Sequence, residues 1–443
     1  MNDQERPISF HEALRFWFKL GFLSFGGPAG QVALMHEELV NKRRWISEQR
    51  FLHALNYCML LPGPEAQQLA TYLGWLMHKS LGGILAGLFF ILPSLLLMLL
   101  LSWLYVTYGH MMLVSDFFFG IKPVVTAIVL QASVRIARRS LTKTPLKIVA
   151  LSAFLTIFLF NVPYPAILLG AALLGILLNV LWPLTSGQPS EHEAINKQRG
   201  PAVIDDDSPT PAHAIFQWQR CLRVALMGVL AFILPMAYLI NTYGQNHLLT
   251  ELSWFFTKAA LLTFGGAYAV LPYVYQGVVN EFQWLTPSQM IDSLALGETT
   301  PGPLIMFVTF IAFMTGYLKA ALGPDHLVQG GLAAGLLVTW FTFLPSFVFI
   351  LLGGPLVEST REDIRLRVPL SAITAAVVGV IFNLALFLAY HVLWPEGFGG
   401  TLDRPSLILA ILAALALFRY RRSVIEVIFF GGLMGLLLRH LIH

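Results

Sequence analysis

The sequence predicts an all-α polytopic membrane protein with about 13 hydrophobic segments, arranged as two inverted-topology repeats with broken or re-entrant helices. Three observations support this. Mean hydropathy is +0.70, and only 12% of the 443 residues are charged, against about 25% in soluble domains. Long apolar runs, several of them sufficient to cross a bilayer core of about 30 Å, recur along the chain. A motif containing glycine and proline also occurs twice.

The apolar segments define the expected elements in order. A β-barrel would show short alternating strands in place of these long unbroken runs. The segments lie near 10–36, 51–77, 82–105, 113–138, 146–161, 164–182, 219–240, 250–276, 288–317, 330–352, 369–392, 404–418 and 424–441.

The duplicated motif is Phe-Gly-Gly-Pro at 25–28, which recurs as Phe-Gly-Gly-Ala at 264–267, an offset of 239 positions (264 minus 25). The same offset relates Pro-Gly-Pro at 62–64 to Pro-Gly-Pro at 301–303. It also relates Lys19 to Lys258 and Trp45 to Trp284. Paired apolar halves interrupted by Gly and Pro at matching places indicate the binding site of a secondary transporter.

Composition divides the chain into four parts. We expect an N-terminal membrane repeat over 1–183, a hydrophilic linker over 184–216, an extra membrane helix over 217–243 and a C-terminal repeat over 244–443. The linker is rich in Pro, Gly, Ser and charge, which predicts a flexible connection. A regulatory segment is the alternative.

Charge placement predicts the topology. Basic residues cluster at 42–44, at 135–147, in the linker, at 361–367 and at 419–422. The positive-inside rule places these clusters, the N-terminus and the linker in the cytoplasm. One unpaired extra crossing between the repeats then turns the second repeat upside down.

The first two segments leave two topologies open. If 10–36 and 51–77 cross fully, the basic loop at 42–44 lies outside, against the positive-inside rule. If each dips into the membrane and returns, turning at its Gly/Pro break, that loop stays cytoplasmic. We favour the re-entrant form. Such irregular backbone is tolerated only where protein or a watery cavity surrounds it.

The helix breaks are the candidate anion site. Two glycines let the backbone leave helical geometry, and Pro28 suits the first turn of a new helix. A helix that restarts there presents unpaired N–H groups and the positive end of its dipole. A simple kink or close helix packing is the alternative. The candidate substrate-binding residues are Lys19, Ser24, Gly26, Gly27, Pro28, Gly30, Gln31, Pro62, Gly63, Pro64, Lys258, Thr263, Gly265, Gly266, Thr299, Thr300, Pro301, Gly302 and Pro303.

Charged residues near the breaks supply further candidates. Lys19 and Lys258 each lie six residues before a Phe-Gly-Gly motif, and an intramembrane lysine is a functional candidate unless it snorkels to the interface. Glu65 and Glu298 flank the Pro-Gly-Pro breaks and are candidates for proton coupling. A helix-capping carboxylate and a loop charge are their respective alternatives.

Other chemistries lack a signature. Cys58 and Cys221 lie in apolar segments, where packing is the expected role. We find no metal-ligand cluster, cofactor motif, phosphate loop, nucleophile elbow or nucleic-acid motif, so we expect no catalytic residue and no cofactor. These absences favour a transporter over an enzyme.

The motifs together resemble the chromate ion transporter family in its long two-domain form. The resemblance rests on Phe-Gly-Gly-Pro, the Trp that follows, Pro-Gly-Pro, and Leu-Pro-Ser at 92–94 and 344–346, and covers nearly the whole chain outside the linker. It implies a bacterial inner-membrane protein with halves of opposite topology that exports chromate and confers chromate resistance. The second half departs from the pattern, with Ala267 in place of proline. A homodimer is an open expectation.

The resemblance names the substrate, whereas the residues alone argue for an anion. We expect a secondary transporter that exports chromate, driven by the membrane potential or by a proton gradient. One alternative is a transporter of sulfate or another inorganic anion. A membrane-embedded transferase acting on a lipid-linked substrate is the alternative from a different class.

Cysteine labelling tests the re-entrant topology. After Cys58 and Cys221 are replaced, Arg43→Cys should react with an impermeant thiol reagent only from the cytoplasmic side and Gln283→Cys only from outside. The repeats place these two positions in equivalent loops of opposite orientation. Labelling of Arg43→Cys only from outside would overturn the re-entrant topology.

Overall fold

The computed structural model describes residues 8–160, 162–181, 202–206, 208, 211, 213–359, 367–397 and 399–442. These residues are almost entirely helical, and the β-structure among them is one isolated bridge between Ile46 and Ile204. Five of the described helices are long and apolar enough to cross a membrane. The predicted all-α polytopic membrane fold is confirmed.

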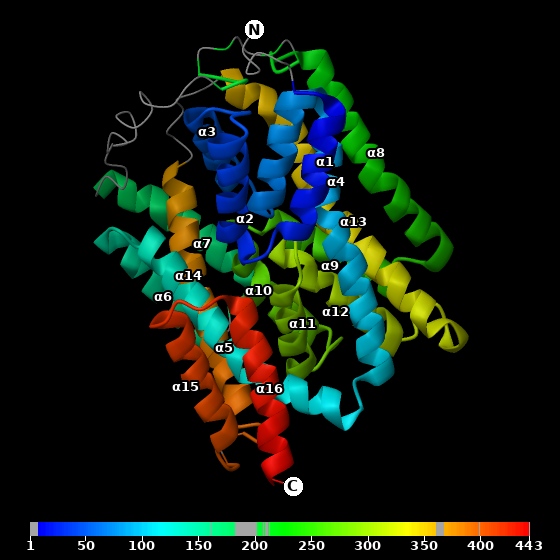
Figure 1. Ribbon diagram of the computed structural model, residues 1–443, viewed down its shortest axis with the longest axis vertical. Helices are drawn as coiled ribbons and strands as arrows, with labels where there is room; N and C mark the ends of the chain where they lie inside the picture. Colours follow the sequence, from blue (N-terminus) through cyan, green and yellow to red (C-terminus); the bar gives the residue numbers. More distant parts are fainter. Residues whose placement is uncertain are drawn as a thin grey trace.

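Along the chain, the helices form two series of matching order, and a single extra helix separates the two series (Figure 1). The first series is α1 (Phe10–Leu23), α2 (Gly27–His36), α3 (Glu48–Leu60), α4 (Glu65–Tyr108), α5 (Met112–Ser140), α6 (Thr144–Phe160) and α7 (Tyr164–Leu181). The extra helix is α8 (Trp218–Tyr243). The second series is α9 (Leu248–Leu261), α10 (Ala267–Tyr275), α11 (Pro287–Thr299), α12 (Phe307–Leu318), α13 (Leu327–Ser359), α14 (Arg367–Leu393), α15 (Arg404–Phe418) and α16 (Val424–Ile442).

The backbone repeats at the same offset as the sequence. A π-helix follows α2 over Glu37–Lys42, and its counterpart follows α10 over Gln276–Glu281. Positive φ angles occur at Gly26, Gly27 and Gly63 in the first half and at the three glycines 239 positions later. Arg44 and Gln283, also 239 apart, share a positive φ although neither is glycine.

The first two helices form a re-entrant hairpin. Arg43, which follows α2, lies 3.5 Å from the carboxylate of Glu12 near the start of α1, and its guanidinium stacks 5.1 Å from the Phe16 ring centroid. The chain therefore returns to the end at which α1 began. In the second half, Phe255 of α9 packs against Phe282 and Trp284, which follow α10.

The next pair is also re-entrant, because α4 contains a turn. His78 and Lys79 have non-helical dihedral angles, and the His78 ring nitrogen lies 2.9 Å from the carbonyl of Ile8. Gly74 packs closely against Gly82 beyond the turn. The first part of α4 therefore runs beside α3 to the end of the molecule that carries Ile8. After the turn, the second part of α4 runs in the opposite direction, toward the other end of the molecule. We call the end that carries Ile8, Arg43 and Ile204 the linker end.

The two series are inverted relative to each other. Gly87 of α4 faces the ring of Phe347 in α13, whereas Leu99, three turns further along α4, faces Gly335 of α13. The two equivalent helices therefore run antiparallel, as the cyan and yellow ribbons show (Figure 1).

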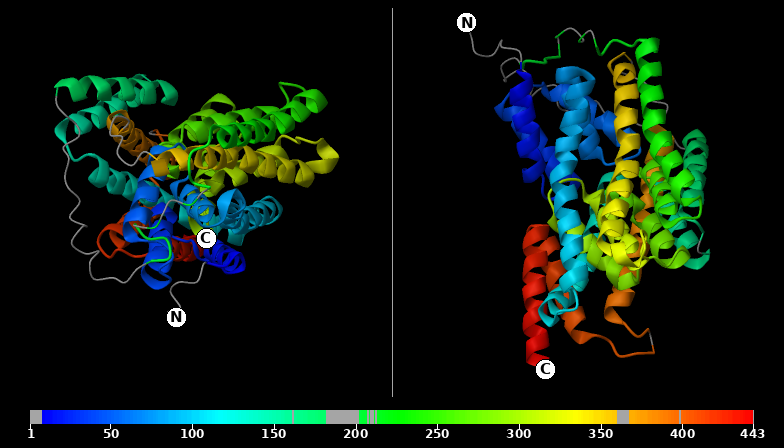
Figure 2. Two further views of the ribbon diagram at one scale, coloured as in Figure 1. Left: turned by 90° about the horizontal axis from the view of Figure 1, so that it is seen from above. Right: turned by 90° about the vertical axis from the view of Figure 1, so that its right-hand side faces the viewer.

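Burial separates a helical centre from a periphery. In the apolar windows of α5 and α14, 56% and 61% of residues are buried, against 22% in α8. Helix α8 lies beside α13 at the edge of the molecule in both views of Figure 2. The helix without a counterpart is therefore an addition to the outside of a symmetric core.

Part of the linker is fixed to the first repeat, which differs from the predicted flexible connection. The N–H groups of Val203 and Ile204 donate to the carbonyls of Arg44 and Trp45, each at 3.0 Å, and the Ser47 hydroxyl donates to Asp206 at 2.5 Å. This pairing joins segments about 160 residues apart, so local composition does not reveal it. The linker positions 184–201 lie outside the described residues.

Glycine substitution tests the packing of the breaks. Gly302 has φ +92°, and a Cβ there would lie 2.9 Å from Cβ of Ser94 and 3.1 Å from the Phe90 carbonyl oxygen. Gly27 also has a positive φ but has open space around it. Positive φ alone costs about 1–2 kcal/mol for a residue with a side chain. Gly302→Ala should therefore lower the thermal midpoint of the purified protein more than Gly27→Ala, and equal losses would contradict this packing.

Candidate functional site

The four helix breaks meet at one junction and complete each other's hydrogen bonds. The N–H of Gly63 donates to the carbonyl of Thr263 at 2.8 Å, and the N–H of Gly302 donates to the carbonyl of Ser24 at 2.8 Å. These two bonds are equivalent under the 239-residue offset. A helix break leaves backbone groups without intrahelical partners, and buried groups of this kind need another partner. Each repeat supplies that partner to the other.

Side chains from the opposite half close the junction. Gly63 packs against the Ser346 hydroxyl and Gly302 against Ser94, so each Pro-Gly-Pro break sits on the Leu-Pro-Ser motif of the other repeat. The Gln68 amide donates to the Pro62 carbonyl at 2.8 Å. The two duplicated motifs thus form one packed unit.

Gln31 makes the junction asymmetric. Its side-chain amide donates to the carbonyl of Gly302 at 2.5 Å and to that of Ser24 at 3.2 Å, so one side chain joins both halves. The equivalent position in the second repeat is Val270, which has no polar group to make such a bridge.

A cavity of about 1180 Å³ leads from the linker end to the break before α10. Its deep part is lined by Pro28, Glu65, Gly265, Gly266 and Tyr268. The π-helix after α2 and the start of α3 line its outer part with His36, Glu37 and Glu48. Of the two Phe-Gly-Gly motifs, the one in the second repeat lines the cavity with its glycines Gly265 and Gly266.

Two arginines one helical turn apart on α5 provide the positive charge of the cavity. Both Arg135 and Arg139 line it and both are exposed. The Arg139 guanidinium donates to the Met59 sulfur at 2.9 Å, a weak acceptor. Such a contact leaves the guanidinium available to a stronger acceptor.

Two carboxylates face these arginines. Glu65 lies 3.6 Å from the position that a Cβ on Gly266 would occupy and interacts electrostatically with Arg139. Glu298 is buried behind the cavity wall, where the Tyr268 hydroxyl donates to its carboxylate. Arg135 lies over the Tyr268 ring, 6.0 Å from its centroid.

Helix α10 begins at the inner end of the cavity. Its N-cap is Gly266, and no side chain caps its first N–H groups. The positive end of the helix dipole therefore points toward the cavity. Together with Arg135 and Arg139, this helix start makes the inner cavity suitable for an anion.

The two repeats also contact each other at the end opposite the linker. There, Tyr105 at the end of α4 donates to the Asp292 carboxylate of α11 at 2.7 Å, and Lys122 of α5 lies 3.9 Å from the same carboxylate. The Lys122 ammonium also donates to Ser288 at 2.5 Å. These contacts link elements of both repeats, so the cavity opens toward the linker end.

The predicted site residues fall into three groups. Pro28, Gly265, Gly266 and Glu65 line the cavity. Others belong to the junction or to helix ends and make hydrogen bonds there: Ser24, Gln31, Gly63, Thr263 and Gly302 bond as described, and the Thr299 and Thr300 hydroxyls donate to carbonyls of α11. The Oε1 of Gln31 has no hydrogen-bond partner among the described residues. Around Gly27 there is open space, whereas Gly30 packs on the Phe25 carbonyl.

Lys19 and Lys258 form the third group. Both side chains are exposed, and neither lines the cavity. The structure therefore does not bring the two lysines together with the breaks. Arg135 and Arg139, which do lie there, entered the sequence analysis only as part of a basic cluster. Their spacing of four residues, which places both on one face of α5, was the available signal.

Comparison with known proteins identifies the family. A family model described as "Chromate transporter" matches residues 11–176 and 250–436. The chain is 31% identical to a chromate transport protein of Pseudomonas aeruginosa, over 97% of this chain and 92% of that protein. It is 28% identical to one of Cupriavidus metallidurans, over 98% of this chain and 94% of the relative.

A protein of Synechococcus elongatus named as a probable chromate transport protein is 25% identical over 96% of both chains. No solved structure matches. These relatives are named as transport proteins, not as enzymes. The family model matches both halves of the chain and omits the linker and α8, so this chain belongs to the chromate transporter family of membrane proteins.

Proposed function

We propose that this protein exports chromate across the bacterial inner membrane by alternating access, and that the anion binds in the cavity between Arg135, Arg139 and the start of α10. The observation that supports this most directly is the convergence of two guanidinium groups and an uncapped helix N-terminus on one cavity. The names of the relatives supply chromate as the substrate.

The charges of the cavity suit a tetrahedral dianion. Guanidinium groups bind oxyanions through paired N–H donors and remain charged at any physiological pH. Backbone N–H groups at the start of α10 add donors without adding a titratable group. Two arginines can offer paired donors to two edges of one tetrahedral oxyanion.

The linker end is cytoplasmic in this proposal. The basic residues Arg43, Arg44 and Arg50 lie there beside the linker, as the positive-inside rule requires. The cavity is then inward-open and receives its anion from the cytoplasm. Exchange to the outward-open form would separate Tyr105 and Lys122 from Asp292 and close the hairpins of the first repeat over the cavity.

The membrane potential suffices as an energy source. A dianion that leaves an inside-negative cell gains about 4.6 kcal/mol per 100 mV, twice the value of about 2.3 kcal/mol for one charge. This corresponds to a concentration ratio of about three decades.

The two carboxylates act as counterions for the empty site. With no anion bound, Glu65 and Glu298 balance Arg139 and Arg135; an arriving anion takes over the arginines. Proton coupling is the second candidate role. Electrostatics fixes the direction in which coupled protons would move, because a bound anion repels a neighbouring carboxylate and so favours its protonation. Protons would then move in the same direction as the anion and reduce the charge that export carries.

Sulfate transport and lipid-linked transfer are the alternative functions. Sulfate is also a tetrahedral dianion and would use the same arginines, so flux of both anions must be measured side by side. A transferase would need a catalytic carboxylate open to the lipid, whereas Glu298 is buried behind Tyr268.

Substitution of the arginines tests the binding site. In liposomes with an imposed potential, Arg135→Gln together with Arg139→Gln should reduce chromate flux at least a hundredfold, since each charge-assisted contact contributes about 1.5–3 kcal/mol. Lys19→Ala with Lys258→Ala is the matched control, because it also removes two positive charges and should retain flux. Loss of flux in the lysine variant with flux preserved in the arginine variant would contradict the assignment.

The potential at which net chromate flux stops tests the energy source. Two charges per anion predict a shift of about 30 mV per tenfold chromate gradient, and one charge predicts about 59 mV. We expect about 30 mV, independent of pH, in wild type and in Glu65→Gln, whose maximal flux should fall. A pH-dependent shift near 59 mV that returns to 30 mV in Glu65→Gln or Glu298→Gln would assign proton coupling to that carboxylate.

A further inference from the structure

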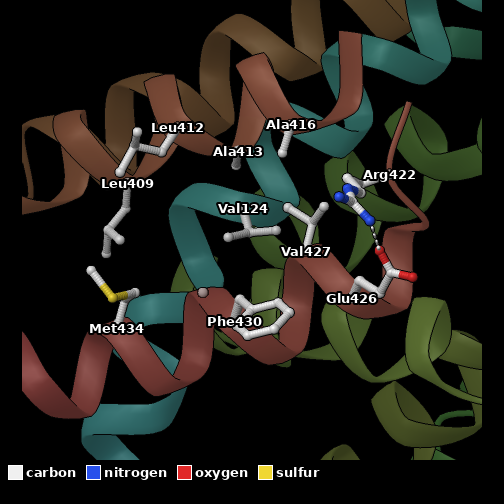
Figure 3. Close-up of a pocket in the computed structure, with 11 residues that line it drawn as sticks. Val124, Leu409, Leu412, Ala413, Ala416, Arg422, Glu426, Val427, Phe430 and Met434 are labelled. Carbon is white, nitrogen blue, oxygen red and sulfur yellow. Dashed lines mark ion pairs between the residues drawn. The ribbon is translucent and has the colours of Figure 1, made fainter. Parts of the chain in front are cut away.

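A second cavity, which shares no lining residue with the anion site, lies between α15, α16 and the middle of α5. Its volume is about 460 Å³. Apolar side chains from all three helices line it, with Leu409 and Leu412 facing Phe430 and Met434 across Val124 (Figure 3). The residues along α15 and α16 give the groove a length of about 12 Å at 1.5 Å per residue.

One end of this groove is strongly basic. The loop between α15 and α16 contains Arg419, Arg421 and Arg422, all exposed. Arg422 lines the groove beside Glu426, 4.0 Å away, with side chains 67% and 51% exposed. An ion pair with such a long N···O distance and such exposed side chains contributes little to stability. The arginines therefore remain available to a stronger anionic partner.

We propose that this groove binds one anionic phospholipid, with an acyl chain along Val124, Leu412 and Phe430 and the phosphate at Arg422 and its neighbours. A phospholipid combines the two required chemistries, a hydrocarbon chain and a phosphate, and surrounds this multi-pass protein. Arginine favours phosphate through paired N–H donors.

The groove shares a helix with the anion cavity. Val124 of α5 lies eleven residues before Arg135 and therefore on nearly the same face of the helix. The Gln131 amide, between them, donates to the Leu417 carbonyl of α15 at 3.2 Å. A bound lipid would thus stabilise the packing of α15 and α16 on the helix that carries the cavity arginines. This consequence, unlike lipid binding itself, rests on the proposed function.

Native mass spectrometry of the purified full-length protein tests the proposal. Phosphatidylglycerol and phosphatidylcholine are added in turn at equal concentration. Wild type should retain one phosphatidylglycerol with a clear preference over phosphatidylcholine. Ala416→Trp, which fills the groove, should abolish the retained lipid. Arg422→Gln should keep lipid binding but reduce the preference about fivefold, the equivalent of about 1 kcal/mol.

Matched controls separate the groove from the remaining surface. Ile411 is exposed on α15 and does not line the groove, so Ile411→Trp should retain the lipid. Arg223 is exposed on α8, so Arg223→Gln should retain the headgroup preference. The proposal is overturned if Ala416→Trp binds lipid as wild type does, if both lipids bind equally, or if a second copy of the chain occupies the groove. Because no transport is measured, failure here leaves the anion site unaffected.

Discussion

The reciprocal backbone bonds between Gly63 and Thr263 and between Gly302 and Ser24 are the constraint on which this architecture depends. Each helix break leaves a buried peptide group without a partner in its own repeat. A buried donor or acceptor left unpaired costs about 1–3 kcal/mol, and more where no water can reach it. Neither repeat can therefore bury its breaks alone. Both repeats are therefore needed to provide hydrogen-bond partners for the buried peptide groups at the breaks.

The scaffold is symmetric, but the chemistry that it supports is not. Apart from Gln31, which aligns with Val270, the motifs that form the junction match between the halves, whereas the charged and aromatic residues at the cavity do not. Glu65 aligns with Leu304, and Glu298 aligns with Met59, the residue that contacts Arg139. Tyr268, which joins Arg135 to Glu298, aligns with Ala29. Glu65 thus lines the cavity and Glu298 lies behind its wall, and the two come from non-equivalent positions of the repeats.

Local sequence signals predicted the fold better than the site. Gly/Pro breaks, repeat offset and inversion depend on backbone chemistry and charge counting, and all three appear in the structure. Lys19 shares one face of α1 with His11 and Arg15 at spacings of four residues, and all three side chains are exposed. The outward direction of Lys19 could therefore have been predicted from the spacing of the polar residues on the helix. Arg135 and Arg139 resembled an ordinary cytoplasmic cluster, because a cavity is a property of several helices. The pairing of Ile204 with Ile46 is likewise non-local.

The position of the junction also explains how one set of bonds can serve both states of a transporter. Each of the two bonds joins one repeat to the other, so both lie at the interface about which the repeats would rock. Groups near an axis move least when elements rock around it. The outer part of the cavity, at His36 and Glu48, and the Tyr105–Asp292 contact lie toward opposite ends of the molecule, where the same rotation produces the largest displacements. Rocking can therefore open one side and close the other while the buried peptide groups keep their partners.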